Sequence, residues 1–326
     1  MSKIKKIIVG LPARNEESAI TKCLESVRES ILYSGRSNTT LVVCLNGCTD
    51  KTPALVETFQ ERYQDIRCEV IQSNEGLVNA QREIVKKYPA DVYVFSDSDS
   101  TIDQRSIELL LSNLEKHSEV VVAYAKTAPL EKLDNKSIFY KLGLLYDSQK
   151  MLRPRHYFHG RLFATRDWFL PPNEEILKRA MKNDYTRELL KYSEKDILLY
   201  ADDVFMSSYI LDRYGRGAIL QVEDARCYSW PVGSFHDWLN TYRRRNIEME
   251  KMYRWFPEYN YLWPWLNRRT GWRNWLKASL TNKILWLAFM MMRGGLYLHV
   301  RAELLLIMFK WFRPKGQWQV TTTTKK

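Results

Sequence analysis

Short apolar runs alternate with amphipathic stretches along the first part of the chain. The apolar runs predict buried strands at 4–11, 39–45, 68–72, 92–95 and 120–124. Between them, apolar residues recur every three or four positions, which predicts helices at 17–33, 53–63, 77–87 and 106–116. Strand–helix units of this kind are typical of a Rossmann-like α/β domain, in which helices flank a mostly parallel sheet.

The pattern is less regular further along the chain. It predicts a helix at 138–151, a strand at 157–164 and a helix at 204–214. Neither an internal repeat nor a low-complexity linker interrupts this part of the sequence. We therefore expect these elements to complete the same domain.

Charge divides the chain into two regions. The apolar content of 45% is ordinary for a globular protein, so disorder is not expected. Residues 1–237 carry 33 Lys and Arg against 34 Asp and Glu, whereas residues 238–326 carry 17 against 4 and hold nine of the eleven Trp. These counts predict a near-neutral domain at 1–237 and a helical, basic, Trp-rich extension at 238–326.

The extension contains two apolar segments, 284–292 and 304–312. Both are shorter than the roughly 20 apolar residues that a membrane-spanning helix needs. Charged residues and glycines break the pattern, namely Arg293, Gly294, Gly295, Arg301 and Glu303. Basic residues together with Trp and Leu are typical of helices that lie on a membrane surface. A helical cap packed on the domain stays open as an alternative, and nucleic-acid binding is disfavoured because the extension shows no known motif for it.

The N-terminal sequence and the cysteines indicate a cytoplasmic protein. The basic start is followed by an apolar run that stops at Pro12, which is too short for the core of a signal peptide. Of the five cysteines only Cys44 and Cys48 lie close together, and no second pair completes a zinc site. We expect reduced thiols and a protein that is peripheral on the cytoplasmic face of the membrane.

Polar or glycine-containing loops follow four of the predicted strands, at 11–17, 46–52, 74–76 and 96–100. Ligands of open α/β sheets bind beyond the carboxyl ends of the strands, so these loops are the candidate site. The first loop lacks Gly-x-Gly-x-x-Gly, and the chain lacks Gly-x-x-x-x-Gly-Lys-Ser/Thr. These absences disfavour a dinucleotide site and a P-loop, and they leave a different nucleotide site open.

Two pairs of carboxylates are candidates for chemistry. Asp97 and Asp99 directly follow a buried strand, and carboxylates with this spacing can coordinate Mg²⁺ or Mn²⁺ together with substrate phosphates. Asp202 and Asp203 open the helix predicted at 204–214. The second pair could cap that helix, or one member could act as a general base on an attacking hydroxyl.

In order and spacing, the loops resemble the family-2 inverting glycosyltransferases, which have the A-type glycosyltransferase fold. The resemblance covers roughly residues 5–245. The matching segments are Pro12-Ala13-Arg14-Asn15-Glu16-Glu17, Asn46-Gly47-Cys48-Thr49-Asp50-Lys51-Thr52, Asn74-Glu75-Gly76 with Ala80, Asp97-Ser98-Asp99, Gly160-Arg161-Leu162-Phe163-Ala164-Thr165-Arg166 and Ala201-Asp202-Asp203.

The resemblance implies roles for individual residues. Asp99 would bind the Mg²⁺ or Mn²⁺ that bridges the diphosphate, and Asp97 would contact the ribose or the metal. Asp203 would be the catalytic base with Asp202 as its neighbour. The nucleotide sugar would be held by Pro12, Ala13, Arg14, Glu16, Asn46, Asn74, Gly76, Arg82 and Asp97, and the acceptor side would include Gly160 and Arg161.

The resemblance also implies the reaction, which is inverting, metal-dependent transfer of a sugar from a nucleotide sugar to an acceptor hydroxyl. The donor would be a UDP-sugar and the acceptor a lipid-linked or other glycan, such as a polysaccharide precursor. One loop reads Leu45-Asn46-Gly47-Cys48 where the family has Asp-Asp-Gly-Ser, so an amide replaces a carboxylate that contacts uracil. The Gln-x-x-Arg-Trp motif of processive synthases is absent, and 240–245 is only a loose counterpart, which favours a single transfer.

Two other functions stay open at the level of the sequence. A nucleotidyltransferase would have the same alternation of strands and helices, but its Gly-rich loop after the first strand is missing here. A catalytically inactive sugar-nucleotide-binding membrane scaffold is disfavoured by the intact carboxylates Asp97, Asp99 and Asp203. The identity of the sugar and the oligomeric state are left open.

Overall fold

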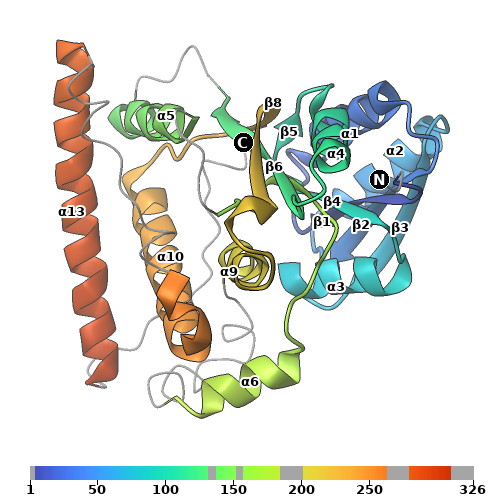
Figure 1. Ribbon diagram of the computed structural model, residues 1–326. Coiled ribbons are helices and arrows are strands. Elements are labelled where there is room, and N and C mark those ends of the chain that lie inside the picture. Colours follow the sequence, from blue (N-terminus) through green and yellow to red (C-terminus); the bar gives the residue numbers. More distant parts are fainter. Residues whose placement is uncertain (1–3, 131–136, 152–156, 184–200, 263–278, 310–326) are drawn as a thin grey trace.

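A computed structural model describes residues 4–130, 137–151, 157–183, 201–262 and 279–309. These residues build an eight-stranded sheet in the order β3-β2-β1-β4-β7-β6-β8-β5 (Figure 1). The strands are β1 Ile7–Ala13, β2 Thr39–Asn46, β3 Arg67–Ser73, β4 Val92–Ser96, β5 Thr101–Ile102, β6 Val122–Pro129, β7 Leu162–Thr165 and β8 Ile219–Ser229. All run in one direction except β7 and β5, which confirms the mostly parallel sheet.

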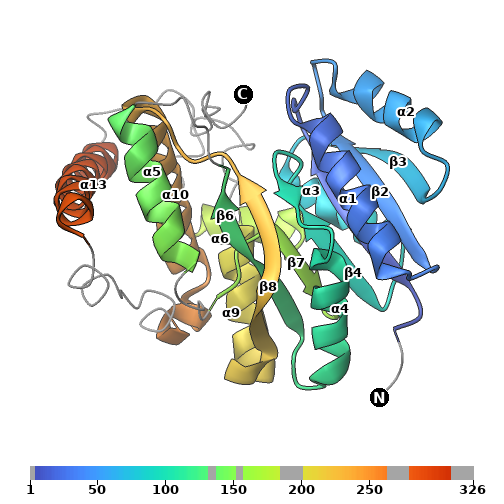
Figure 2. The same cartoon turned by 90° about the horizontal axis from the view of Figure 1, so that it is seen from above.

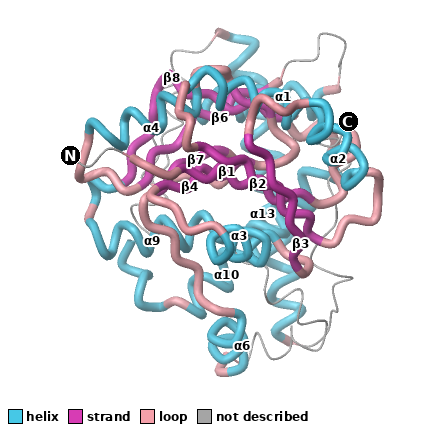
Figure 3. Tube along the Cα trace, turned by 90° about the vertical axis from the view of Figure 1, so that its right-hand side faces the viewer, coloured by secondary structure: helices cyan, strands magenta, loops and turns pink. Residues whose placement is uncertain are grey.

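Helices cover both faces of the sheet. One face packs against α1, α2 and α4, and the other against α3, α6, α9 and α10. Figures 2 and 3 show the sheet between these two layers. The helices are α1 Ile20–Ser34, α2 Thr52–Arg62, α3 Leu77–Lys87, α4 Ser106–Lys116, α5 Ile138–Met151, α6 Asn173–Met181, α9 Asp202–Tyr214, α10 Phe235–Trp255 and α13 Leu280–Met308, with two short 3₁₀ helices η1 Arg216–Ala218 and η2 Pro257–Leu262.

The central strand β1 shows why the apolar runs become buried strands. Its Val9 packs in the core beneath α1, and the neighbouring Ile8 packs in the core beneath α3. Because both faces are covered, every residue of β1 is buried. Gly10 lies opposite Phe95 of β4, and a Cβ atom at Gly10 would come within 2.7 Å of the Phe95 ring. Only glycine leaves room for that ring.

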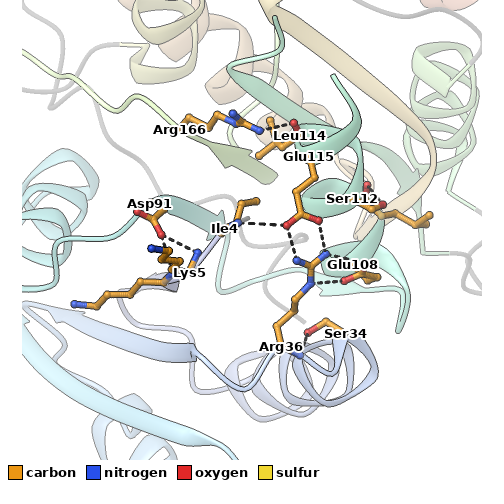
Figure 4. Close-up of polar contacts among 12 residues, drawn as sticks. Ile4, Lys5, Ser34, Arg36, Asp91, Glu108, Ser112, Leu114, Glu115 and Arg166 are labelled. Atoms are coloured by element: carbon orange, nitrogen blue, oxygen red, sulfur yellow. Dashed lines mark hydrogen bonds and ion pairs between the residues drawn. The ribbon is translucent and has the colours of Figure 1, made fainter. Parts of the chain in front are cut away.

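A cluster of charged side chains lies at the end of the sheet where β1 begins. Arg36 Nε donates to Glu108 Oε2 at 3.0 Å, and its Nη1 donates to Glu115 Oε1 at 2.8 Å. The backbone N–H of Lys5 donates to Asp91 Oδ2 at 2.8 Å (Figure 4). These charges lie at the amino end of β1, so we assign them a structural role.

Most of the predicted elements are confirmed, with three differences. The strand expected at 120–124 is β6, which begins at Val122 and continues to Pro129. The strand expected at 157–164 is only the short β7, because residues 157–161 form a loop. The sequence pattern did not predict α6, β5 or β8, and it gave α10 only as part of the helical extension expected from residue 238.

The C-terminal helices are attached to the domain. The predicted boundary at residue 237 falls inside α10, whose Met252 and Trp255 pack in the same core as α3 and α9. The segments predicted at 284–292 and 304–312 belong, as far as Met308, to one helix, α13, which continues through Gly294 and Gly295. Each glycine costs a helix about 1 kcal/mol, and the packing of α13 on α5 and α10 offsets this. Residues 310–312 lie outside the described residues.

No helix in the described part of the chain is long and apolar enough to cross a membrane.

Candidate active site

The carboxyl ends of three parallel strands bring the predicted loops to one edge of the sheet. Ala13 ends β1 and pairs with Leu45 of β2, while β4 ends one residue before Asp97. Asn46 at the end of β2 accepts a hydrogen bond from the backbone N–H of Gly76 at 2.6 Å. The loop that follows β3 is thereby fastened to the end of β2.

The two loops after β1 and β2 hold each other. Asn15 adopts a left-handed conformation with φ of 52°, and its Oδ1 accepts from the backbone N–H of Thr49 at 2.8 Å. The backbone N–H of Glu16 donates to Thr52 Oγ1 at 2.8 Å, and the Glu16 side chain is buried. These bonds fix the loop that carries the predicted nucleotide contacts.

The other predicted nucleotide residues differ in their environment. Pro12 and Ala13 are buried within β1, so the predicted contacts would come from their backbone. Arg14 forms an ion pair with Glu75 of the loop after β3. Asn74 in that loop is exposed, and Gly76 has φ of 127°, a conformation that favours glycine.

Arg82 belongs to α3 and bonds both to its own helix and to α6. One guanidinium nitrogen, Nη1, donates to Asn79 Oδ1 at 3.4 Å and to Asn173 of α6. Its Nε and Nη2 are buried and have no hydrogen-bond partner within the described residues. The guanidinium therefore has unused donors, which is compatible with the predicted contact to a phosphate.

The Asp97–Asp99 loop meets the start of β7. The backbone N–H of Asp97 donates to the Arg161 carbonyl at 2.9 Å, and Ser100 Oγ donates to Asp99 Oδ1 at 3.1 Å. Burial and the charge of Asp99 raise the pKa of Asp97 to about 8, and the Arg161 guanidinium partly counteracts this rise. Negative charge in this loop is therefore under-compensated by the protein itself.

The second carboxylate pair lies in the first turn of α9. Gln81 of α3 donates through Nε2 to Asp202 Oδ2 at 3.3 Å, and Asp203 Oδ1 accepts from the backbone N–H of Val204 at 2.8 Å. A methyl group at Gly160 would lie 3.8 Å from the Asp203 Cβ, an ordinary van der Waals contact, so the loop before β7 lies beside the first turn of α9.

All four carboxylates share one site. The charges of Asp202 and Asp203 contribute to the raised pKa of Asp97, which places both pairs within electrostatic range of each other. Burial, followed by the charge of Asp203, raises the pKa of Asp202 to about 7. The structure thus brings together the residues that the sequence placed more than a hundred positions apart.

Sequence reasoning missed two residues of this site. Gln81 is buried on α3 and bonds to Asp202, and Glu248 of α10 raises the pKa of Asp202 through its charge. Burial raises the pKa of Glu248 itself, and the charges of Arg244 and Lys251 oppose this rise. Arg244 Nε lies 3.8 Å from Glu248 Oε1. A polar residue on the buried face of a helix is the signal that could have revealed Gln81.

The donor atoms suit a hard divalent cation. Among the described residues there is no cluster of three or more His, Cys, Asp or Glu that could hold a metal alone. Asp97 and Asp99 supply carboxylate oxygens, which Mg²⁺ and Mn²⁺ prefer, and such ions complete their coordination with water and substrate phosphates. A cation there would offset the repulsion that raises the pKa of Asp97. The residues present therefore fit such an ion.

Several solved structures resemble this chain. Mannosyltransferase PcManGT from Pyrobaculum calidifontis, solved with GDP-Man and Mn²⁺, has a TM-score of 0.52 and 17% identity over 94% of this chain and 86% of that chain. S. aureus TarS 1-349 gives a TM-score of 0.45 and 17% identity, with 94% and 88% of the chains covered. Glucosyl-3-phosphoglycerate synthase from Mycobacterium tuberculosis gives a TM-score of 0.39 and 20% identity, with 71% and 72% covered. A comparison with curated proteins found no match.

The resemblance to the Pyrobaculum enzyme shows a shared fold, in which helices flank a mostly parallel sheet and further helices follow at the C-terminus. Residues 8–169 match the family model described as Glycosyl transferase family 2. This range includes the loops after β1, β2, β3 and β4 and the whole of strand β7. The chain therefore belongs to glycosyl transferase family 2, as an enzyme with the A-type glycosyltransferase fold that uses a nucleotide-sugar donor.

Proposed function

We propose that the enzyme transfers a single sugar from a UDP-sugar to an acceptor hydroxyl, with inversion and with a divalent cation. The observation that carries this proposal is the convergence of the Asp97–Asp99 loop and the Asp202–Asp203 turn, because the charges of Asp202 and Asp203 both raise the pKa of Asp97. One pair suits the diphosphate side of a nucleotide sugar, and the other suits the acceptor side. The family match favours this reaction over nucleotidyl transfer.

The donor half is formed by the loops after β1, β2 and β3. Backbone and side-chain groups of these loops would hold the nucleoside, and the hydrogen bonds between the loops keep them in place before the donor arrives. Pre-organisation of this kind lowers the entropic cost of binding. The residues assigned to the nucleotide sugar are Pro12, Ala13, Arg14, Glu16, Asn46, Asn74, Gly76, Arg82 and Asp97.

Asp99, with Asp97, would hold the cation. When bound, Mg²⁺ or Mn²⁺ neutralises charge that develops on the leaving diphosphate. The protein's part is to hold two carboxylates at the end of a rigid strand, with Ser100 Oγ fixing the Asp99 carboxylate. Oriented ligands of this kind bind an ion without reorganisation.

The acceptor half is formed by the first turn of α9 and the start of β7. Asp203 would take the proton from the acceptor hydroxyl as that oxygen attacks the anomeric carbon. Gly160 lies beside Asp203 and carries no side chain, and the Arg161 guanidinium acts on the Asp97 carboxylate through its charge. A single displacement from the face opposite the leaving group inverts the anomeric configuration.

We assign the acceptor to glycans, either lipid-linked or precursors of a polysaccharide, and the enzyme to the cytoplasmic face of the membrane. The basic extension supports this, because residues 238–326 carry 17 Lys and Arg against 4 Asp and Glu. Lys and Arg near an anionic membrane each contribute about 1 kcal/mol of attraction. A lipid-linked acceptor would then stay in the bilayer while the donor arrives from solution.

The metal assignment is tested with Asp99→Asn. We expect the variant to keep its fold and to lose Mn²⁺-dependent release of UDP from a UDP-sugar, and EDTA to abolish release by the unaltered enzyme. Asp224→Asn is the matched control, because Asp224 is exposed on β8. Full activity of Asp99→Asn, or of the enzyme in EDTA, would show that Asp99 does not hold a required metal ion.

A further inference from the structure

Helix α13 is the outermost of the described elements in this region. It packs on α10 and α5 through an inner face that includes Trp286, Phe289 and Leu296. A second group, Val300 and Leu304, packs against Ile247 of α10. Figures 1 and 2 both show α5 and α10 between α13 and the sheet. The other side of α13 therefore faces away from the rest of the described molecule.

That outer side is also apolar. Leu280, Ile284, Leu287, Met291 and Leu298 have between 60% and 76% of their surface exposed, and they recur at intervals of four, three, four and seven residues. This spacing places them along one stripe of the helix. We call these five residues the outer face of α13. Soluble proteins rarely expose a continuous apolar patch of more than roughly a few hundred Å², so a patch of this kind marks an interaction surface.

Charge identifies the partner of the outer face. Within α13 the basic residues are Lys283, Arg293 and Arg301, and the single acid is Glu303, which forms an ion pair with Arg243 of α10. Arg301 in turn pairs with Glu250 of α10. The whole extension has the same bias, with 17 basic residues against 4 acidic ones. A surface with anionic headgroups above an apolar layer complements both features. A second copy of this chain would instead place two basic extensions side by side.

The dimensions of α13 suit a helix that lies on a bilayer. Its 29 residues give a length of about 43 Å, which exceeds the roughly 30 Å of a hydrocarbon core. Yet Arg293 sits near its middle, and none of the described helices is apolar enough to span. A helix with two apolar sides, one held by the protein and one exposed, can insert the exposed side into the headgroup boundary.

We propose that the outer face of α13 is the surface through which this enzyme docks on an anionic lipid bilayer. The inference rests on the peripheral membrane association proposed above and assigns that association to one face of one helix. Insertion of the outer face supplies apolar binding energy, and the basic residues of the extension supply electrostatic attraction. Both contributions are needed, so binding weakens when salt is added and when the apolar residues are replaced.

The test uses the full-length chain with Leu287→Gln and Met291→Gln combined. The matched control combines Leu32→Gln and Met181→Gln, the same residue types exposed elsewhere on the molecule. Each protein is sedimented with phosphatidylcholine vesicles that contain or lack phosphatidylserine, at low and at high salt. Thermal melting and light scattering report the fold and the oligomeric state of each protein.

We expect the unaltered enzyme and the control to bind the vesicles that contain phosphatidylserine. The outer-face variant should bind about 100-fold more weakly, at about tenfold per side chain, with an unchanged melting temperature. If the variant binds as tightly as the unaltered enzyme, the assignment to α13 is wrong and the membrane association stands. If the unaltered enzyme does not bind these vesicles, both are wrong, while release of UDP with a water-soluble acceptor still tests the glycosyl transfer separately.

Two further outcomes would also overturn the inference. A fall of several degrees in the melting temperature of the outer-face variant would show that another segment of the chain covers this face. Dissociation of a dimer by the same substitutions would show that a second copy covers it.

Discussion

Replacing Asp97 with asparagine should stabilise the ligand-free enzyme at neutral pH, although it removes a residue assigned to donor and metal binding. Burial and the charge of Asp99 raise the pKa of Asp97 from 3.8 to about 8. Between these two values the folded enzyme keeps a proton that the unfolded chain has released. The stability associated with Asp97 is therefore complete below about pH 4 and is lost as the pH rises towards 8.

The size of the effect follows from the same numbers. A difference of one pKa unit corresponds to about 1.4 kcal/mol. At pH 7 the substitution can therefore raise the free energy of unfolding by at most about 4 kcal/mol. Solvent that reaches the partly exposed side chain reduces this to about 2 kcal/mol. In a protein of this size we expect the melting temperature of Asp97→Asn to exceed that of the unaltered enzyme by about 5 °C.

The assay is thermal melting in EDTA across the pH range in which Asp97 titrates. The stabilisation by Asp97→Asn should be small near pH 5 and should grow towards pH 8. Asp224→Asn, at an exposed position, should show no such growth. If Asp97→Asn is less stable than the unaltered enzyme throughout this range, the ionised carboxylate is favourable in the fold and burial does not raise the pKa of Asp97.

Three further changes address the base, its environment and the packing beneath the site. Asp203→Asn should lower turnover by about 100-fold or more and leave donor binding intact in a calorimetric titration. Gln81→Leu removes the hydrogen bond that lowers the pKa of Asp202, so the acid limb of the pH–rate profile should move to higher pH by up to about one unit. Gly10→Ala should destabilise the fold by about 1–3 kcal/mol in urea titrations, because the new methyl group meets Phe95.

Specific results would contradict each of these expectations. An active Asp203→Asn beside an inactive Asp202→Asn would mean that the other member of the pair is the base. An unchanged acid limb in Gln81→Leu would show that the ionisation of Asp202 does not limit the rate. A Gly10→Ala variant as stable as the unaltered enzyme would show that the Phe95 ring can move aside.

The first half of the domain could be predicted because each of its elements has a simple pattern. Strands such as β1 and β2 are buried on both faces and therefore read as continuous apolar runs. By contrast, β8 has two exposed charged residues in its middle, Glu223 and Asp224, which conceal its pairing with β6. The C-terminal extension was expected to be helical, but the polar sequence of α10 and the two glycines of α13 hide the bounds of its helices, which tertiary packing stabilises.

Part of the candidate site could likewise be predicted from the sequence, and part could not. The loops after β1, β2 and β4 could be located because the ends of parallel strands meet at one edge of the sheet. Gln81 and Glu248 come from helices, and the sequence does not reveal that α3 and α10 turn these side chains toward Asp202. Contacts between distant helices depend on packing, which local pattern does not encode.

The configuration of the product shows whether the transfer is inverting, and its rate of formation by the Asp203 variant shows whether Asp203 is the base. Proton NMR of a reaction that contains an α-linked UDP-sugar, Mn²⁺ and a soluble acceptor glycan reads this configuration from the anomeric coupling. We predict a β-linked product from the unaltered enzyme and from Asp224→Asn, and almost none from Asp203→Asn. An α-linked product would show that the transfer is retaining, and a β-linked product formed equally fast by Asp203→Asn would show that Asp203 is not the base.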